Sequence, residues 1–297
     1  MNAFAQHFFD FARTITPASR LRMAPTPSGF LHLGNALNFI LNWLAAKSGG
    51  GCTLDASPAN IFLRIDDLDT DRKRSDYEAD IFETINWLKL DWNSPTNHPV
   101  TNSRSPIHQS TNLPHYFKIL ERLRAQGLLF ACRKSRRDLE PFGPAYPIEF
   151  RNQNLSLNAP DVAWRIKTPP NFPLPDFVVR RRDGIPAYQV ASFADDLKFG
   201  ITHIVRGVDL ADSTAAQCFM AQVLSEDKFL EIKFLHHPLV LGETGEKLSK
   251  STGSTALKIM REAGVGPEKV FQMVGQWLNL EGNTADALLD TLRFKLA

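Results

Sequence analysis

Two short motifs contain residue types that can bind and activate phosphate groups. The first, His32-Leu33-Gly34-Asn35, closes a Pro/Ser/Gly-rich segment over residues 25–35. A helix that begins here would present free backbone N–H groups and the positive end of its dipole to an anion, and His32 could donate to a phosphate oxygen. Gly34 would let the backbone come close to a ligand. A His-x-Gly pair is common by chance, so this motif alone is better explained as a capped core helix.

The second motif, Lys247-Leu248-Ser249-Lys250-Ser251, lies in a Gly-containing loop over residues 242–254. A fixed pentapeptide occurs by chance in roughly one chain of this length in two thousand. Ammonium groups on a loop suit the charge that develops on a pyrophosphate leaving group. A solvated basic loop is the alternative, and the first motif argues against it. Together the motifs predict an ATP-using enzyme in which His32, Lys247 and Lys250 act on phosphates.

The segments around the first motif predict the strand, loop and helix of a nucleotide-binding fold. Residues 21–24 form a short apolar strand, and residues 36–46 are apolar over the length of a helix. A second strand is predicted at residues 61–65. The helix after it places the following residues on one face: Tyr77, Ile81, Ile85 and Leu88. This βαβα order predicts an α/β fold with a Rossmann-like parallel sheet.

The middle third of the chain has a different pattern, with Pro-rich loops. It predicts an amphipathic helix at 113–126, a strand at 162–167, and an Asp183-Gly184 turn between strands at 177–181 and 185–190. Further on, the pattern predicts a strand at 201–206 and a last helix containing Val270, Val274 and Trp277. We therefore expect a catalytic core over 1–104 and 183–297, with an N-terminal extension over 1–19, and an inserted acceptor-binding α+β subdomain over 105–182.

Composition excludes several classes of protein. Hydrophobic residues make up 43% and charged residues 22%, and the formal net charge is +2, which excludes a disordered chain and a purely electrostatic nucleic-acid binder. No apolar run reaches the roughly 18 residues of a membrane helix, and the N-terminus lacks a secretory pattern. The three cysteines are far apart in the sequence and suggest no disulfide framework. We expect a monomeric cytoplasmic protein.

In this order, the two motifs resemble the paired signatures of class I aminoacyl-tRNA synthetases. Segments 22–29, 63–69, 181–189 and 200–207 narrow the likeness to the glutamyl-tRNA synthetase catalytic domain, and the resemblance covers residues 20–257. Only 46 residues follow Ser251, too few for that family's separate anticodon-binding domain. The chain is therefore similar to the truncated glutamyl-Q tRNA(Asp) synthetases. This resemblance implies that glutamate is attached to the queuosine base of tRNA-Asp.

The resemblance also implies how glutamate is held. Arg22 and Tyr188 would bind its side-chain carboxylate, and Arg206 its α-carboxylate; Thr26 and Asp66 would receive the ammonium group. Forked guanidinium groups opposite two carboxylates give charge-matched recognition. The full expected set is Arg22, Met23, Ala24, Pro25, Thr26, Asp66, Tyr188 and Arg206 for glutamate, and His32, Gly34, Asn35 and Lys250 for ATP. Taken alone, each arginine is more typical of a surface ion pair, and Asp66 of a solvated acidic turn.

The reaction implied is attack of the glutamate carboxylate on the α-phosphate of ATP, with charge stabilised by His32, Lys250 and Mg²⁺. Asp66 stands where the family usually has glutamate, so we expect an ammonium contact that is longer or bridged by water. Many relatives bind zinc through Cys-x-Cys and a later Tyr-x-x-x-Cys. Here Cys132 is kept, but Lys134 and Phe150 replace two thiolates. We therefore expect no zinc and no protein-held metal.

Partner and function leave alternatives open. The densest basic run, Arg133, Lys134, Arg136 and Arg137, predicts either a tRNA-backbone contact or a solvated face. The functional alternatives are a catalytic-domain glutamyl-tRNA ligase acting on the tRNA 3′ end, an inactive paralogue that binds tRNA or glutamate, and a nucleotidyltransferase of the same superfamily. The segments around Tyr188 and Arg206 argue against the last of these.

Overall fold

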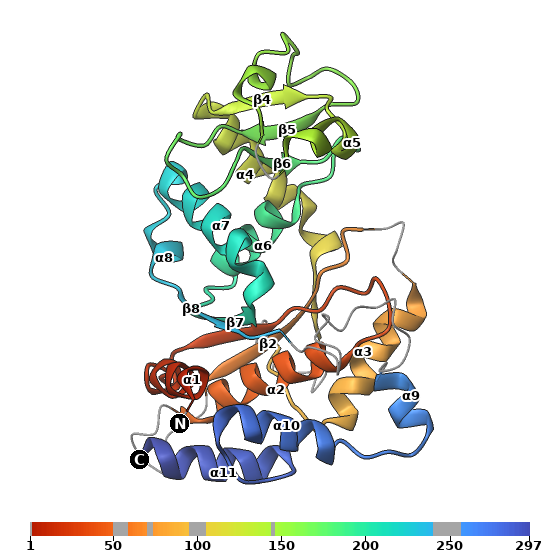
Figure 1. Cartoon of the computed structure of the whole chain (residues 1–297), viewed down its shortest axis with the longest axis vertical. Helices are drawn as coiled ribbons and strands as arrows, with labels where there is room; N and C mark the ends of the chain where they lie inside the picture. The colour runs from red at the N-terminus through yellow and green to blue at the C-terminus, as the bar shows by residue number, and fades with distance from the viewer. Residues whose placement is uncertain (1, 50–58, 70–73, 95–104, 144–145, 240–256) are drawn as a thin grey trace. The chain divides into compact units, whose positions relative to one another are not determined.

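The computed structural model describes residues 2–49, 59–69, 74–94, 105–143, 146–239 and 257–297. These residues form two compact units (Figure 1). The first contains Met1–Ser110, Gly200–Asp209 and Ile232–Ala297, and the second contains Thr111–Phe199 and Leu210–Glu231. The contacts divide the chain differently from the predicted boundaries, because residues 183–199 and 210–231 lie in the second unit.

The strands of the first unit run parallel to their neighbours. β1 (Arg20–Met23) pairs with β2 (Asn60–Ile65), which pairs with β3 (Ile107–His108). β7 (His203–Gly207) pairs with β8 (Lys233–His237). At the start of β7, the Thr202 N–H donates to the Arg20 carbonyl at 2.9 Å, which sets β7 beside β1. The predicted α/β fold with a parallel sheet is confirmed.

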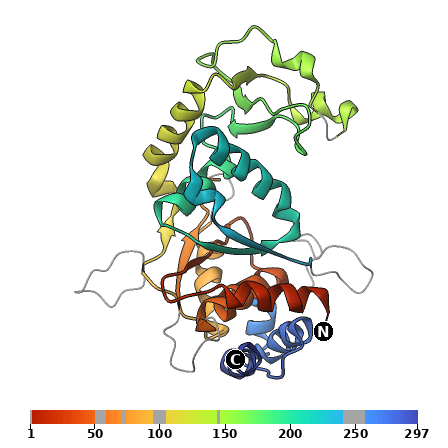
Figure 2. The same ribbon diagram turned by 90° about the vertical axis from the view of Figure 1, so that its left-hand side faces the viewer.

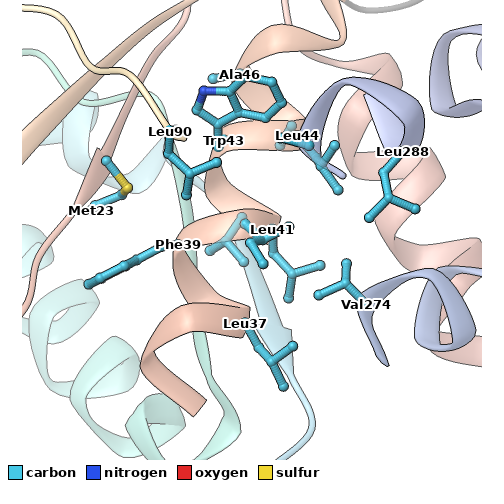
Figure 3. Packing of buried hydrophobic residues seen from close by; sticks show 14 of the residues in the cluster. Met23, Leu37, Phe39, Leu41, Trp43, Leu44, Ala46, Leu90, Val274 and Leu288 are labelled. Atoms are coloured by element: carbon cyan, nitrogen blue, oxygen red, sulfur yellow. The ribbon is translucent and has the colours of Figure 1, made fainter. Parts of the chain in front are cut away.

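One face of these strands packs on helix α2 (Leu33–Lys47), which contacts both β1 and β2. Figure 3 shows Leu37, Leu41 and Leu44 of α2 directed toward the C-terminal helices, where Val274 and Leu288 lie. Val274 belongs to α10 (Glu268–Leu278) and Leu288 to α11 (Ala285–Leu296). Burial of each such side chain stabilises the unit by roughly 1.5–3 kcal/mol, so α2 is fixed firmly against the sheet.

The N-terminal segment, expected to be only a short extension, forms helix α1 (Ala3–Arg13). Its side chains Phe8, Phe9 and Phe11 are buried. The helix contacts α10 and β8, and Figure 2 shows it beside the C-terminal helices. The Asn2 side chain caps it by accepting from the Ala5 N–H at 2.8 Å. The N-terminal helix is therefore part of the core of the first unit.

Two further helices of this unit lie side by side, α3 (Ser75–Trp87) and α9 (Leu257–Glu262) (Figure 1). α3 confirms the helix predicted from its periodicity, with Ile81 and Ile85 fully buried. Among the described residues, no helix combines the length and apolar character needed to cross a membrane.

The second unit combines an antiparallel sheet with helices. β4 (Leu129–Cys132), β5 (Ala163–Ile166) and β6 (Phe177–Arg180) pair in that order. Its longer helices are α4 (Leu113–Ala125), α6 (Tyr188–Lys198) and α7 (Ala211–Leu224), and two short helices are α5 (Arg136–Leu139) and α8 (Asp227–Leu230). Short 3-10 helices of this unit lie at Glu140–Phe142 and Ile148–Arg151, and two more, Gln109–Asn112 and Val208–Leu210, span boundaries between the units in the sequence.

The predicted strand at residues 185–190 is wrong. The Asp183-Gly184 turn is present, with Gly184 at φ +89° and the Arg181 N–H donating to the Ile185 carbonyl at 2.8 Å. Beyond it only Pro186 pairs, in an isolated bridge with Arg180, and α6 begins at Tyr188. Pro186 has no N–H with which to extend a ladder, and the residues that follow are buried around the whole circumference of a helix over 190–196.

His203 connects α1 to the sheet and gives the first unit a dependence on pH. Its Nε2 lies 3.1 Å from the Thr14 hydroxyl and its Nδ1 lies 2.8 Å from the Thr202 hydroxyl. The Phe11 ring contacts it edge-on, with centroids 5.4 Å apart. Burial, followed by the charge of Lys233, lowers the pKa of His203 to about 4. The native unit therefore holds this imidazole neutral.

Because the unfolded chain binds this proton at about pH 6.5, the contribution of His203 to stability is complete above that pH and falls as the pH drops toward 4. At pH 5 the expected loss is roughly 2 kcal/mol. We predict that urea unfolding at pH 7.5 and pH 5 will show this loss in the wild type and not in His203→Gln. The other buried histidines are present in both proteins, so their contributions to the pH dependence cancel in the comparison. Equal losses of unfolding free energy in the two proteins would contradict the assignment of this loss to His203.

Candidate active site

The candidate glutamate-binding arginines share one face of the parallel strands. Alternate residues of a strand point to opposite faces. Leu21 and Met23 of β1, like Val205 of β7, belong to the hydrophobic cluster under α2. Arg22 and Arg206 therefore lie on the other face, where they are only 4% and 3% exposed. The guanidinium of Arg206 stacks on the Phe234 ring, with 5.0 Å between its central carbon and the ring centroid.

Asp66 lies at the carboxyl end of β2, next to the loop that leaves β1. Its N–H donates to the Pro25 carbonyl at 2.9 Å. Its carboxylate accepts from Arg64 through both oxygens, from Nε at 2.6 Å and from Nη2 at 3.1 Å. Both side chains are buried, so the pair must stay intact to avoid an uncompensated charge. Arg64, which the sequence analysis did not single out, thus orients Asp66.

The first motif forms the start of α2, and His32 is its N-cap. The Nδ1 atom of His32 accepts from the Gly34 N–H at 3.1 Å, while the Asn35 side chain accepts from the His32 N–H at 3.0 Å. An imidazole that accepts at Nδ1 carries its proton on Nε2 when neutral. His32 can therefore cap the helix and also donate from Nε2 to an anion at the helix N-terminus.

The other residues expected to bind glutamate differ in exposure. Met23 is fully buried in the core (Figure 3), so only its backbone can contact a ligand. Thr26 is exposed, and Ala24 is half-buried. Thr26 lies one residue beyond Pro25, whose carbonyl is bonded to the Asp66 amide. The loop and the carboxylate expected to receive the ammonium group are thus adjacent.

Two other groups of expected residues lie outside the described part of the first unit. Tyr188 is half-buried at the first position of α6 in the second unit, directly after the hairpin turn. Lys247 and Lys250 lie outside the described residues. The first unit thus places Arg22 on β1, Arg206 on β7, Asp66 directly after β2, and the His32 helix end in the connection that follows β1.

No group of three or more His, Cys, Asp or Glu residues in the described part of the chain is arranged to hold a metal ion. ATP phosphates bind Mg²⁺ themselves.

The positions that resemble zinc ligands do come together in the second unit. The Cys132 sulfur lies 3.1 Å from the Tyr146 hydroxyl, and the Lys134 ammonium lies 4.5 Å from the Phe150 ring centroid. The rings of Tyr146 and Phe150 contact each other edge-on. A hydrogen bond and a cation–π contact thus occupy the place of the ligand set.

This Cys132–Phe150 cluster perturbs the acidity of its members. Burial raises the pKa of Tyr146, and its hydrogen bond with Cys132 adds to the rise. Burial acts to raise the pKa of the Cys132 thiol as well. Hydrogen bonds from Tyr146, Gln153 and the Lys134 amide outweigh burial and lower the pKa of that thiol overall. The central guanidinium carbon of Arg165 lies 4.4 Å from the Tyr146 ring centroid, and the positive charge of Arg165 also lowers the pKa of the Cys132 thiol.

We predict that the second unit is stable without metal. Prolonged treatment with a strong chelator should leave the melting temperature unchanged. By contrast, Tyr146→Phe should lower the free energy of unfolding by about 1 kcal/mol, because it removes the hydroxyl that bonds to Cys132, Gln153 and the Phe150 carbonyl while keeping the ring contacts. Metal analysis of the purified protein and thermal unfolding test this. Release of zinc together with a large fall in melting temperature would contradict it.

The basic run at the end of β4 is largely exposed. Arg133 and Arg137 are exposed, and Lys134 is half-buried against Phe150. The Arg133 carbonyl accepts a hydrogen bond from the Arg182 guanidinium, and the Arg133 side chain donates to the Pro160 carbonyl at 3.2 Å. The tRNA-backbone contact predicted for this run stays a prediction.

Comparison with known proteins gives the family. Residues 19–142 and 150–285 match the family model described as class I tRNA synthetases (E and Q), catalytic domain. The chain belongs to this family. The chain is 36% identical over 287 residues to a glutamyl-Q tRNA(Asp) synthetase of Synechococcus sp. (strain CC9605), covering 93% of this chain and 89% of that relative. A protein of the same name from Nitratidesulfovibrio vulgaris is 32% identical over 278 residues, covering 83% of this chain and 82% of the relative.

A solved structure of the same fold is the glutamate-tRNA synthetase from Elizabethkingia anophelis. It superposes with a TM-score of 0.71 at 24% identity, and the match covers 93% of this chain. The chain spans 65% of the length of that synthetase. The resemblance to class I synthetases that the two signature motifs indicate is confirmed.

Sequence reasoning missed three residues that support the site. Arg64 lies within the strand segment that carries the resemblance. Since Arg64 and Asp66 are two residues apart on a strand and carry opposite charges, the sequence could have predicted their ion pair. Asp80 and Arg261 are 181 positions apart and join α3 to α9 at 2.6 Å. No local pattern marks such a distant pair.

Proposed function

We propose that this protein activates glutamate with ATP and transfers the glutamyl group to tRNA, with the queuosine of tRNA-Asp as the acceptor. The observation that carries the proposal is the placement of Arg22 and Arg206, which are buried on one face of neighbouring parallel strands whose other face packs on the His32-capped helix. In parallel α/β folds, ligands bind at the carboxyl ends of such strands. The similarity to relatives named glutamyl-Q tRNA(Asp) synthetase supports this choice of acceptor.

In the proposed activation step, an oxygen of the glutamate α-carboxylate attacks the α-phosphorus of ATP. A new P–O bond forms as the bond to the β-phosphate bridge breaks, and pyrophosphate leaves. His32 donates its Nε2–H to a phosphate oxygen, and the free amides of the first turn of α2 stabilise the same charge. Arg206 holds the α-carboxylate, and Arg22 with Tyr188 holds the side-chain carboxylate. Lys247 and Lys250 stabilise the departing pyrophosphate.

In the proposed transfer step, a hydroxyl of the tRNA acceptor attacks the carbonyl carbon of the adenylate. An ester bond forms, the acyl–phosphate bond breaks, and AMP leaves. We further propose that the protein acts as a monomer in the cytoplasm. Free thiols at Cys132 and Cys218 suit a reducing compartment.

Glutamate-dependent exchange of labelled pyrophosphate into ATP tests the activation step, with aspartate and glutamine as controls. We expect exchange with glutamate and without tRNA. Transfer of labelled glutamate is then compared between tRNA-Asp that contains queuosine and tRNA-Asp that lacks it. Label on the queuosine-containing tRNA alone supports the proposal. Label that requires only an intact 3′ end identifies an ordinary glutamyl-tRNA ligase, and no exchange with any amino acid identifies an inactive paralogue.

A further inference from the structure

The residue before the His32 N-cap is fixed through both of its backbone polar groups. The Leu31 N–H donates to Asp80 Oδ2 at 2.7 Å, and the Leu31 carbonyl accepts from the Leu257 N–H at 3.1 Å. Asp80 belongs to α3, and Leu257 is the first residue of α9. Leu31 is itself buried. The backbone that leads into the catalytic helix end is thus held between two helices.

Asp80 is the central group of this connection. It is a buried carboxylate, 2% exposed, and its second oxygen accepts from Arg261 Nη2 at 2.6 Å. Arg261 also donates through Nη1 to the Thr84 hydroxyl at 2.7 Å. A buried carboxylate is tolerated only when its charge is paired and its oxygens are hydrogen-bonded. One oxygen of Asp80 therefore accepts from Arg261, and the other accepts from the backbone N–H of Leu31.

Phe30 adds a second connection between the same elements. Its ring contacts the Tyr77 ring of α3 edge-on, with centroids 5.0 Å apart. The Lys258 ammonium of α9 lies 4.3 Å from the Phe30 ring centroid. Residues 30 and 31 are consequently in contact with α3 and α9 on both sides.

We propose that Asp80 and Arg261 are positioning residues for ATP activation. They fix Leu31, and through it the direction in which His32 Nε2–H and the first amides of α2 point. Neither residue is assigned a substrate contact, so the role is distinct from binding. The inference rests on the proposed function, because it concerns the same activation step. A displacement of about 1 Å in a group that stabilises the transition state costs up to roughly 100-fold in rate.

Asp80→Asn tests the inference with little change in shape. Leu31 and Arg261 donate to different oxygens of Asp80, so an asparagine places its NH2 donor opposite one of these two donors. We expect kcat for glutamate-dependent pyrophosphate exchange to fall about 10- to 100-fold, with KM for ATP and for glutamate changed less than about threefold. Arg261→Lys, which keeps a charge beside Asp80 but loses the fork to Thr84, should give a smaller fall in kcat of the same kind.

Two control variants separate positioning from general stability. Glu83→Gln removes the other carboxylate contact of Arg261, at 3.0 Å, without touching Leu31. Asp91→Asn disturbs a comparable carboxylate elsewhere in the unit, which accepts from Trp43 Nε1 and Lys47 Nζ, each at 2.7 Å. Both controls should keep the wild-type kcat per folded molecule, even where Asp91→Asn lowers the melting temperature as much as Asp80→Asn does.

The outcomes are distinguishable. Suppose that the wild-type protein catalyses exchange. The positioning role is then overturned if folded Asp80→Asn keeps its kcat, or if Asp80→Asn and Asp91→Asn lose kcat equally. In either case the proposed function is unaffected. If Asp80→Asn does not fold, Arg261→Lys decides in the same way. A wild-type protein that exchanges with no amino acid overturns the proposed function, and the positioning role with it. A loss of kcat confined to Asp80 and Arg261 supports the inference.

Discussion

His32→Ala is expected to reduce glutamate-dependent pyrophosphate exchange by roughly 100- to 1,000-fold, which is the usual effect of removing one preorganised donor from a developing oxyanion. The donor is Nε2–H, because Nδ1 already accepts from the Gly34 N–H. The same substitution removes an N-cap and should cost about 1 kcal/mol of stability. Steady-state exchange and thermal unfolding measure the two effects.

His32→Asn separates these two effects. Asparagine is a strong N-cap residue, so the helix end should keep its stability. Its shorter side chain, used for capping, no longer presents a donor at the position of Nε2. We expect near wild-type unfolding together with the same large loss of exchange as in His32→Ala. A His32→Asn protein with wild-type exchange would reduce His32 to a structural cap.

Arg22→Gln is expected to lower kcat/KM for glutamate by roughly 100- to 1,000-fold, because it leaves a desolvated carboxylate of the substrate without its charged partner. The effect should be specific to the side chain of the substrate. Glutamine has an amide in place of that carboxylate, so its inhibition constant in the exchange assay should change little. The preference for glutamate over glutamine should therefore fall by at least about tenfold.

Arg206→Lys is the matched comparison on the same sheet face. It keeps a positive charge but loses the forked geometry and the stacking on Phe234. Since glutamate and glutamine share the α-carboxylate, we expect this change to weaken both amino acids by similar factors and to preserve the preference between them. If Arg22→Gln also weakened both equally, the assignment of Arg22 to the side-chain carboxylate would be wrong.

Local patterns were sufficient for the elements of the first unit that surround the site. The helix of α2 and the strands β1 and β2 are marked by apolar runs, because elements buried on most sides exclude polar residues over their whole length. The same patterns left α6 ambiguous, since a short apolar run bounded by a turn fits a buried strand or a helix equally well. Its helical state is decided by Pro186 and by tertiary packing of residues such as Phe193, which is fully buried.

Helix α1 was missed for a related reason. Phe8, Phe9 and Phe11 provide an apolar surface, but nothing in the local sequence states that α10 and β8 are there to cover it. The contacts of His203 with Thr14 and Phe11 have the same origin. Their energies arise from groups that are close only after the chain has folded.

The sequence by itself determined the family, the chemistry and most of the candidate residues, because phosphate and carboxylate binding require particular side chains at short, fixed spacings. Only the tertiary structure decided how these residues are oriented. It pairs Arg64 with Asp66, turns His32 so that Nδ1 caps α2, and fixes Leu31 between Asp80 and Leu257. The orientation of each side chain depends on hydrogen bonds between segments that are distant in the sequence. The sequence of one such segment does not indicate which other segment it will contact.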